Sequence, residues 1–160
     1  MTRNAMPGKT AATDLIGAEL ELIKRNVPGV RGSVAATSDG LLIAHDVHDM
    51  EPTQIAALVA ALHAVALRAT LSTDSGDFRD VITRASEGYL AVFAAGETAI
   101  VAVLGTSGLN VAMLNYQARA MIVRVAEIAA GLARAATAEP AYPMPAKEPD
   151  GELPVRRRRR

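Results

Sequence analysis

Residues 54–71 read QIAALVAALHAVALRATL and predict a helix of about five turns with almost no polar side. This segment limits what the chain can fold into, because a helix that is apolar all round must be covered on both sides. At 100° per residue its bulky side chains gather on one side. They are Ile55, Leu58, Val59, Leu62 and Val65. We expect this side to pack on a β-sheet.

The opposite side of the same helix carries small residues and ends in two leucines. Its members are Ala56, Ala57, Ala60, Ala61, Ala64, Leu67 and Leu71. A small domain has only one core, so a helix with two apolar sides needs a second partner. The alanines would let another helix approach closely, and a second copy of this helix is the simplest candidate. We therefore expect a subunit contact, the alternative being a central helix wrapped by its own chain.

The composition indicates one globular domain, since half of the 160 residues are hydrophobic. Basic and acidic residues balance over the whole chain, but outside residues 137–160 there are eleven basic and thirteen acidic residues. Residues 1–136 therefore show no phosphate-binding surface and no DNA-binding motif. Aromatic residues make up only 3% of the chain, which argues against base-stacking and sugar sites. The absence of cysteine excludes disulfides, thiol catalysis and thiolate zinc sites.

The compartment is expected to be the cytoplasm. The first twelve residues contain no apolar run and cannot act as a signal peptide. The longest apolar stretch, residues 55–67, includes His63 and is too short to span a bilayer.

Hydrophobic spacing and turn residues predict eight elements. Residues 1–12 are expected to be a flexible leader, and Thr13 to cap a helix with a buried stripe of Ile16, Leu20, Ile23 and Val27. Asn110 is expected to cap the last helix, whose predicted buried stripe is Val111, Leu114, Ala118, Met121, Val125, Ile128 and Leu132. Glycines at positions 40, 88 and 96 mark hairpin turns. The predicted elements in chain order are 13–26, 30–37, 41–46, 54–71, 78–86, 89–95, 98–105 and 110–132.

This order predicts an α+β domain over residues 13–136, with a five-stranded antiparallel sheet flanked by helices on both faces. The strand 98–105 is apolar at nearly every position and should be central. The strand 78–86 alternates polar and apolar residues, as an edge strand does. Residues 137–160 are rich in proline and alanine, have little to bury, and are expected to be disordered.

The segments VPGVRGSVAATSDGLLIAHD and GYLAVFAAGETAIVAVLGTSGLNVAML, with the Ala/Leu helix between them, resemble the Roadblock dynein light-chain family, in particular its bacterial members. The resemblance spans residues 13–132. It implies a Roadblock/profilin-like sandwich that forms a homodimer. The third strand would pair with its copy through Arg79, Val81 and Thr83, and the long helices would lie against each other beneath the joined sheets.

The resemblance also implies a non-enzymatic regulatory adaptor that binds and regulates or localises a small Ras-like GTPase in bacterial signalling, often beside a sensor kinase. The residues themselves show no catalytic constellation, and we expect no cofactor and no catalytic or metal-binding residue. One alternative is a small-ligand sensor or enzyme that uses the glycine-containing loop 105–110 ahead of a helix N-terminus. Another alternative is a dimeric tether to anionic membrane or nucleic acid.

Three groups of polar residues have both a functional and a simpler structural interpretation. His45 and His48 have a spacing that can hold a metal, but they straddle a strand end where side chains diverge, so solvated loop polarity is the better interpretation. His63 lacks a nucleophile partner and is expected to be hydrogen-bonded at the rim of the subunit contact. The charges at Asp77, Arg79, Asp80 and Arg84 are expected to control the register of paired edges, with a docking surface as the alternative.

The chain ends in five adjacent guanidiniums that repel one another and do not build a fold. They are Arg156, Arg157, Arg158, Arg159 and Arg160. Such a run can bind anionic lipid, an acidic protein or nucleic acid in a salt-dependent way. The sequence favours lipid or an acidic protein over DNA, and membrane association through this tail is the alternative to a purely cytoplasmic location.

Overall fold

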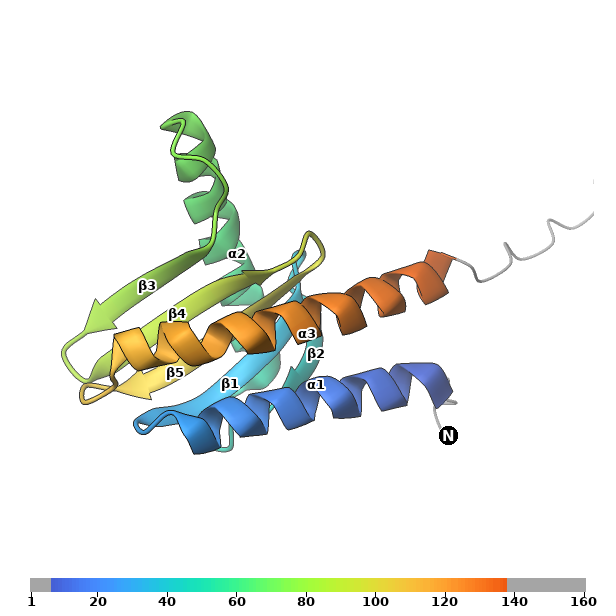
Figure 1. Ribbon diagram of the computed structural model, residues 1–160, viewed down its shortest axis with the longest axis horizontal. Helices are drawn as coiled ribbons and strands as arrows, with labels where there is room; N and C mark the ends of the chain where they lie inside the picture. Colours follow the sequence, from blue (N-terminus) through green and yellow to red (C-terminus); the bar gives the residue numbers. More distant parts are fainter. Residues whose placement is uncertain (1–6, 138–160) are drawn as a thin grey trace, which may run out of the picture.

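The computed structural model describes residues 7–137 as three helices and one five-stranded sheet (Figure 1). The α+β class and the predicted order of elements are confirmed. The elements are α1 (Pro7–Asn26), β1 (Val30–Thr37), β2 (Leu42–His45), α2 (Pro52–Ser72), β3 (Asp80–Ala85), β4 (Gly88–Ala95), β5 (Ala99–Thr106) and α3 (Val111–Thr137).

The sheet has the strand order β2-β1-β5-β4-β3, and all neighbouring strands are antiparallel. β5 lies at the centre, and its residues 99–103 are all buried. The prediction of a central strand covered on both faces is therefore confirmed. β2 and β3 are the two edges, so β3 is an edge strand as its alternation predicted.

The two faces of the sheet are covered unequally (Figure 1). α1 and α3 lie side by side on one face and enclose the larger core. The stripe Ile16, Leu20, Ile23 and Val27 of α1 is buried there as predicted. α3 contributes Leu114, Ala118, Met121 and Val125, also as predicted, together with Ala129. The other predicted members of this stripe are only partly buried, namely Val111, Ile128 and Leu132. α2 alone covers the other face and forms a smaller core with it.

The ends of two helices differ from the prediction. α1 begins at Pro7, so residues 7–12 are helical and Thr13 is not the N-cap. Proline suits the first turn of a helix because that turn needs no N–H from it. α3 continues to Thr137, since alanine favours the helix even where the hydrophobic spacing is lost. The remainder of the predicted leader and tail, residues 1–6 and 138–160, lies outside the described residues.

Two of the hairpin glycines serve different purposes. Gly40 has a φ of 91°, which supplies the left-handed conformation the β1–β2 turn was expected to need. Gly88 does not have a positive φ and is instead the first residue of β4. A Cβ there would lie 2.2 Å from the carbonyl oxygen of Gly105 on β5. Close contact between strands, and not turn geometry, is what requires this glycine.

The prediction that the bulky side of α2 packs on the sheet is only partly right: Val59 is buried there and Ile55 and Leu62 pack against the same core. Leu58 and Val65 are exposed, whereas Ala56 and Ala60 are buried with Val59 against the sheet. The helix passes so close to the β1–β2 hairpin that a Cβ at Gly40 would lie 3.4 Å from the Cβ of Ala60. This close approach favours the small residues Ala56 and Ala60 beside Val59 on the inner side, and it leaves Leu58 and Val65 on the outer side.

The expectation that no segment is long enough to span a membrane is also revised. α2 has 21 residues, and by length and composition alone it could cross a bilayer. The prediction considered only residues 55–67, whereas the helix extends beyond them at both ends. Its inner side at Ala56, Val59 and Ala60 is part of the core, which explains some of its apolar character without a membrane.

Candidate functional site

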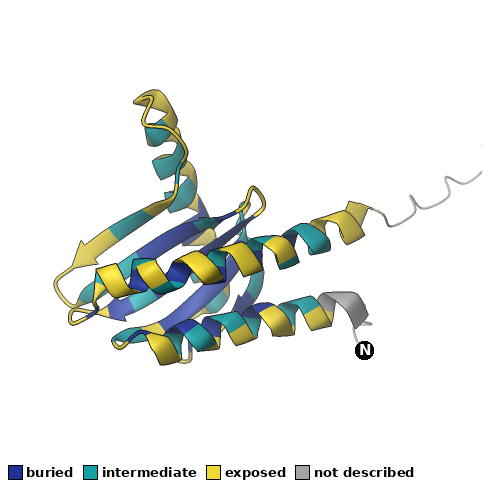
Figure 2. Ribbon diagram, viewed as in Figure 1, coloured by how far each residue is buried: buried dark blue, intermediate teal, exposed yellow. Residues whose placement is uncertain are grey.

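The second half of α2 lies beyond the sheet with no core of its own. Figures 1 and 2 show the helix projecting past the strands, with its far end coloured as exposed or intermediate. No residue between positions 61 and 80 is buried. At 1.5 Å per residue, the twelve helical residues from position 61 onward extend for about 18 Å. A helical segment of this length with such an apolar sequence is poorly stabilised unless something covers it.

The outward side of α2 is a largely apolar surface with one charged residue, Arg68, and we call it the open face. Its members are Ala57, Leu58, Ala61, Ala64, Val65, Arg68 and Leu71, all of them exposed. Leu58, Val65 and Leu71 are 64%, 69% and 70% exposed. Isolated exposed leucines are common on proteins, but a contiguous row on one helix face marks an interaction surface.

The open face contains only some of the residues that were predicted for the helix contact, which itself stays a prediction. Ala57, Ala64 and Leu71 are exposed as expected, and Leu67 is half-buried. Ala56 and Ala60 are 0% and 7% exposed and belong to the protein's own core. The prediction that these two alanines face a partner subunit is therefore wrong.

Leu58 and Val65 are the residues that the sequence reasoning assigned to the wrong side. A signal for them was present in the sequence. Arg68 is the one charged residue of the segment 54–71, and it shares a stripe with Leu58 and Val65 at helical spacing.

The edge of β3 is the second open element. β3 pairs with β4, and no described strand pairs with its other side. Val81 is half-buried and packs in the α2-side core, while Thr83 is exposed. Arg79 lies just before the strand, and its carbonyl accepts a hydrogen bond of 3.1 Å from the N–H of Ala94. These residues of the predicted pairing edge therefore lie along a free edge, on a strand shorter than the predicted 78–86.

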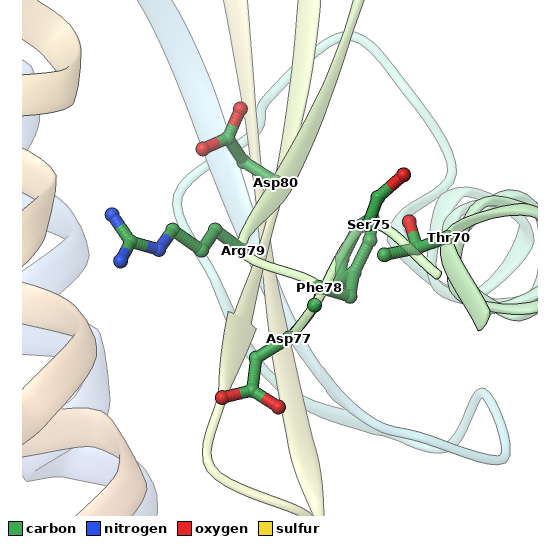
Figure 3. A pocket seen from close by; sticks show the side chains of 7 residues that line it. Thr70, Ser75, Asp77, Phe78, Arg79 and Asp80 are labelled. Carbon is green, nitrogen blue, oxygen red and sulfur yellow. The ribbon is translucent and has the colours of Figure 1, made fainter. Parts of the chain in front are cut away.

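A hollow of about 460 Å³ lies at the corner where α2 leads into β3. Figure 3 shows that its side chains diverge: Arg79 and Asp80 point away from the helix, while Phe78 points toward it. Asp77 and Asp80 therefore do not converge on a common point, as a catalytic or ligand-binding pair would. The mixed charges predicted for this region are all exposed, and Arg84 lies 5.7 Å from the ring of Tyr89.

His63 connects the projecting half of α2 to this corner. Its ring meets the ring of Phe78 edge-on, with 5.1 Å between centroids. This contact takes the place of the hydrogen bond that the sequence led us to expect. Desolvation by burial lowers the pKa of His63 below its ordinary value, because the charged imidazolium loses hydration there.

The other candidate sites gain little from the structure. His45 and His48 are both exposed, and the described residues contain no group of three or more possible metal ligands.

In the loop 105–110, the N–H of Thr106 donates a hydrogen bond to the carbonyl oxygen of Gly29. The N–H of Leu109 donates to the carbonyl oxygen of Thr106. Asn110 caps α3 as predicted, accepting a 3.0 Å hydrogen bond from Met113 N–H. These amides are used within the protein, which favours a plain connection over an anion site. The five terminal arginines lie outside the described residues.

Comparison with known proteins agrees with this architecture. The family model of the Roadblock/LC7 domain matches residues 18–105. A Roadblock/LC7 domain structure from Streptomyces avermitilis is 26% identical, with a TM-score of 0.63, and the match covers 68% of this chain and 92% of that one. No curated protein matches the chain significantly by sequence.

Two further solved structures share the fold at lower identity. The gliding protein MglB from Thermus thermophilus is 19% identical with a TM-score of 0.66, covering 76% of this chain and 93% of that chain. MglB from Myxococcus xanthus is 13% identical with a TM-score of 0.66, covering 71% and 94%. Since the family match spans more than half of the residues, the chain belongs to the Roadblock/LC7 domain family.

Proposed function

We propose that this protein is a non-enzymatic, cytoplasmic regulatory adaptor that forms a homodimer and binds a small Ras-like GTPase. The observation that carries the proposal is the open face of α2, with Leu58, Val65 and Leu71 each more than 60% exposed. A helix this apolar is stable in water when a partner covers it. Because the open face and the free β3 edge belong to consecutive elements, a second copy of the chain could cover both at once.

The charges on β3 support a particular arrangement of the two copies. Antiparallel pairing of two β3 strands around a two-fold axis at Ile82 would place Asp80 opposite Arg84 of the partner subunit. Both residues are exposed and lie on the same side of the strand. This register would join opposite charges twice, once on each side of the axis. A shift of one residue would remove the match, so the charges would fix the register.

The assembly is tested by sedimentation velocity on Ala61→Glu, which places a charge at the middle of the open face. We expect the dimer to dissociate, because two carboxylates would be buried at an apolar contact without partners. Ala120→Glu is the matched control, since Ala120 is an exposed alanine on α3 at the other face of the sheet. A wild-type protein that sediments as a monomer at micromolar concentration would refute the homodimer.

The strand register is tested by exchanging the two charges. Asp80→Arg alone and Arg84→Asp alone are expected to weaken the dimer, and the double exchange to restore it. Failure of the double variant to recover affinity would show that the two strands do not pair around Ile82.

The GTPase partner is proposed from membership in the family and its bacterial resemblance. Calorimetric titration of this protein with a small Ras-like GTPase, loaded with GDP or with a non-hydrolysable GTP analogue, should give affinity that depends on the nucleotide. The isolated protein should release no phosphate from GTP, as expected of an adaptor. If this protein bound neither the GDP-loaded nor the analogue-loaded GTPase, the proposed GTPase role would be contradicted. That result would not bear on the proposed homodimer.

A further inference from the structure

The opposite edge of the sheet carries a groove that the proposed dimer would leave open. The groove lies between α1 and β2, has a volume of about 430 Å³, and is bounded by Asp14 and Glu21 on the helix and by His45 on the strand. Its floor on the helix is formed by Gly17 and Ala18. A Cβ at position 17 would meet nothing within 4 Å, so the space above the helix is open.

The charged side chains that line this groove are acidic. Asp14 and Glu21 are both exposed, and no lysine or arginine lines the groove. The two acidic residues are seven positions apart, which places them about 10 Å apart along the helix axis on one side. Arg25 lies one turn beyond Glu21 and limits the negative region at that end. The geometry fits an extended basic segment that runs along α1.

The chain supplies such a segment itself. Pro154 and Val155 lead into the five terminal arginines. In a polyproline II conformation, residues three positions apart project to the same side and are about 9 Å apart. Arg156 and Arg159 would therefore match the spacing of Asp14 and Glu21.

The place where the described chain ends makes this contact reachable. α3 ends at Thr137, at the same end of the molecule as the amino-terminal end of α1 (Figure 1). Residues 138–155 separate Thr137 from the first terminal arginine, and eighteen residues span up to about 56 Å in a polyproline II conformation. Asp14 is only seven residues, or about 10 Å along the helix, from Pro7. The linker therefore reaches the groove with length to spare.

We propose that the C-terminal arginines dock in the α1–β2 groove of their own chain, with Asp14 and Glu21 as the acidic contacts. Exposed ion pairs are individually weak, but a short linker holds the tail at an effective concentration in the millimolar range. The docked tail is withheld from anionic competitors and is released by salt. The hollow at the α2–β3 corner is a poorer acceptor, because Arg79 lines it.

The test uses the full chain with a nitroxide spin label on Val155→Cys, which is specific because the protein has no cysteine. Amide NMR signals of Gly17, Ala18 and His45 should lose most of their intensity in the oxidised sample relative to the reduced one. The loss should disappear in the double variant Asp14→Asn/Glu21→Gln. It should also disappear near 1 M sodium chloride, where charges are screened beyond about 3 Å.

Two controls test whether the broadening is specific to the groove and whether it arises within one chain. Glu87→Gln/Glu97→Gln removes two exposed carboxylates from the hairpin turns of β3–β4 and β4–β5, and it should leave the broadening unchanged. Isotope-labelled protein without a nitroxide, mixed with unlabelled spin-labelled protein, reports contacts between chains.

Three outcomes would overturn the proposal. The first is no broadening, or broadening at Thr70 and Asp77 in place of the groove. The second is broadening that occurs only in the mixture, which would assign the groove to another copy's tail. The third is groove signals that shift with a free penta-arginine peptide while the chain's own label has no effect, which would assign the groove to a basic segment of another protein.

Discussion

The imidazole of His63 on α2 meets the ring of Phe78 edge-on, at 76° between the ring planes and 5.1 Å between the centroids. This pair joins the projecting half of α2 to the chain entering β3. This aromatic contact adds to the packing of Val81 in the α2-side core, and both contacts hold together the two elements that carry the open face and the free strand edge. Its strength bears on how well both surfaces are presented to a partner.

The contact should depend on pH through His63. Burial lowers its pKa in the folded state below the ordinary 6.5, so the folded protein binds a proton less readily than the unfolded chain. The resulting stability is fully present above pH 6.5 and is lost as the pH falls through the folded-state pKa. Urea unfolding between pH 7.5 and 5 should show wild type losing more stability than His63→Gln. His48→Gln, at an exposed position, should follow the wild type; equal slopes for all three proteins would contradict the prediction.

Asp46 and Ser33 should respond very differently to removal of their side chains. The buried carboxylate of Asp46 accepts a hydrogen bond from the N–H of Ser33, and Lys24 Nζ lies 3.7 Å from its other oxygen. Asp46→Ala leaves that buried N–H unpaired and should cost about 1–3 kcal/mol of unfolding free energy.

The Ser33 hydroxyl is buried and has no hydrogen-bond partner among the described residues. Ser33→Ala should therefore stay within about 1 kcal/mol of wild type or gain stability. Chemical denaturation of both variants checks this, and a larger loss for Ser33→Ala would contradict it.

Ala60 and Ala61 are neighbours with opposite roles. Ala60 is 7% exposed against the β1–β2 hairpin, while Ala61 belongs to the open face. Ala60→Glu should unfold the domain or lower its melting temperature strongly, because the carboxylate would be buried without a partner. Ala61→Glu should retain the native circular dichroism spectrum and change only the assembly. Similar melting of both variants at concentrations where each is monomeric would show that the assignment of the two sides is wrong.

Two glycines provide a contrast in stability. Gly88→Ala would place a Cβ 2.2 Å from the Gly105 carbonyl oxygen and force β4 and β5 apart, at a cost of about 1–3 kcal/mol or more. A Cβ at Gly131 in α3 would meet nothing within 4 Å. Gly131→Ala should therefore raise stability by about 0.5–1 kcal/mol through helix propensity. Thermal unfolding of the two variants tests the pair, and a stable Gly88→Ala protein would contradict the strand spacing.

Local patterns determined the elements, since each depends on residues close together in the chain. The stripe Ile16, Leu20, Ile23 and Val27 repeats at helical spacing, and β5 is apolar throughout, so their burial followed from the sequence. Asn110 could be predicted as a cap because its side chain bonds to an amide three residues away. The free edge at β3 followed from its alternation of polar and apolar residues.

The tertiary structure alone decided which side of α2 faces inward. Both sides of that helix are apolar, so its periodicity gives two solutions, and the inward side combines Val59 of the bulky side with Ala56 and Ala60 of the small side. The decision depends on the close approach of α2 to the hairpin at Gly40, where a Cβ at that glycine would lie 3.4 Å from the Cβ of Ala60. The ring contact of His63 with Phe78 and the groove between α1 and β2 likewise join residues distant in the chain. Such contacts arise from the path of the whole backbone, which no local pattern encodes.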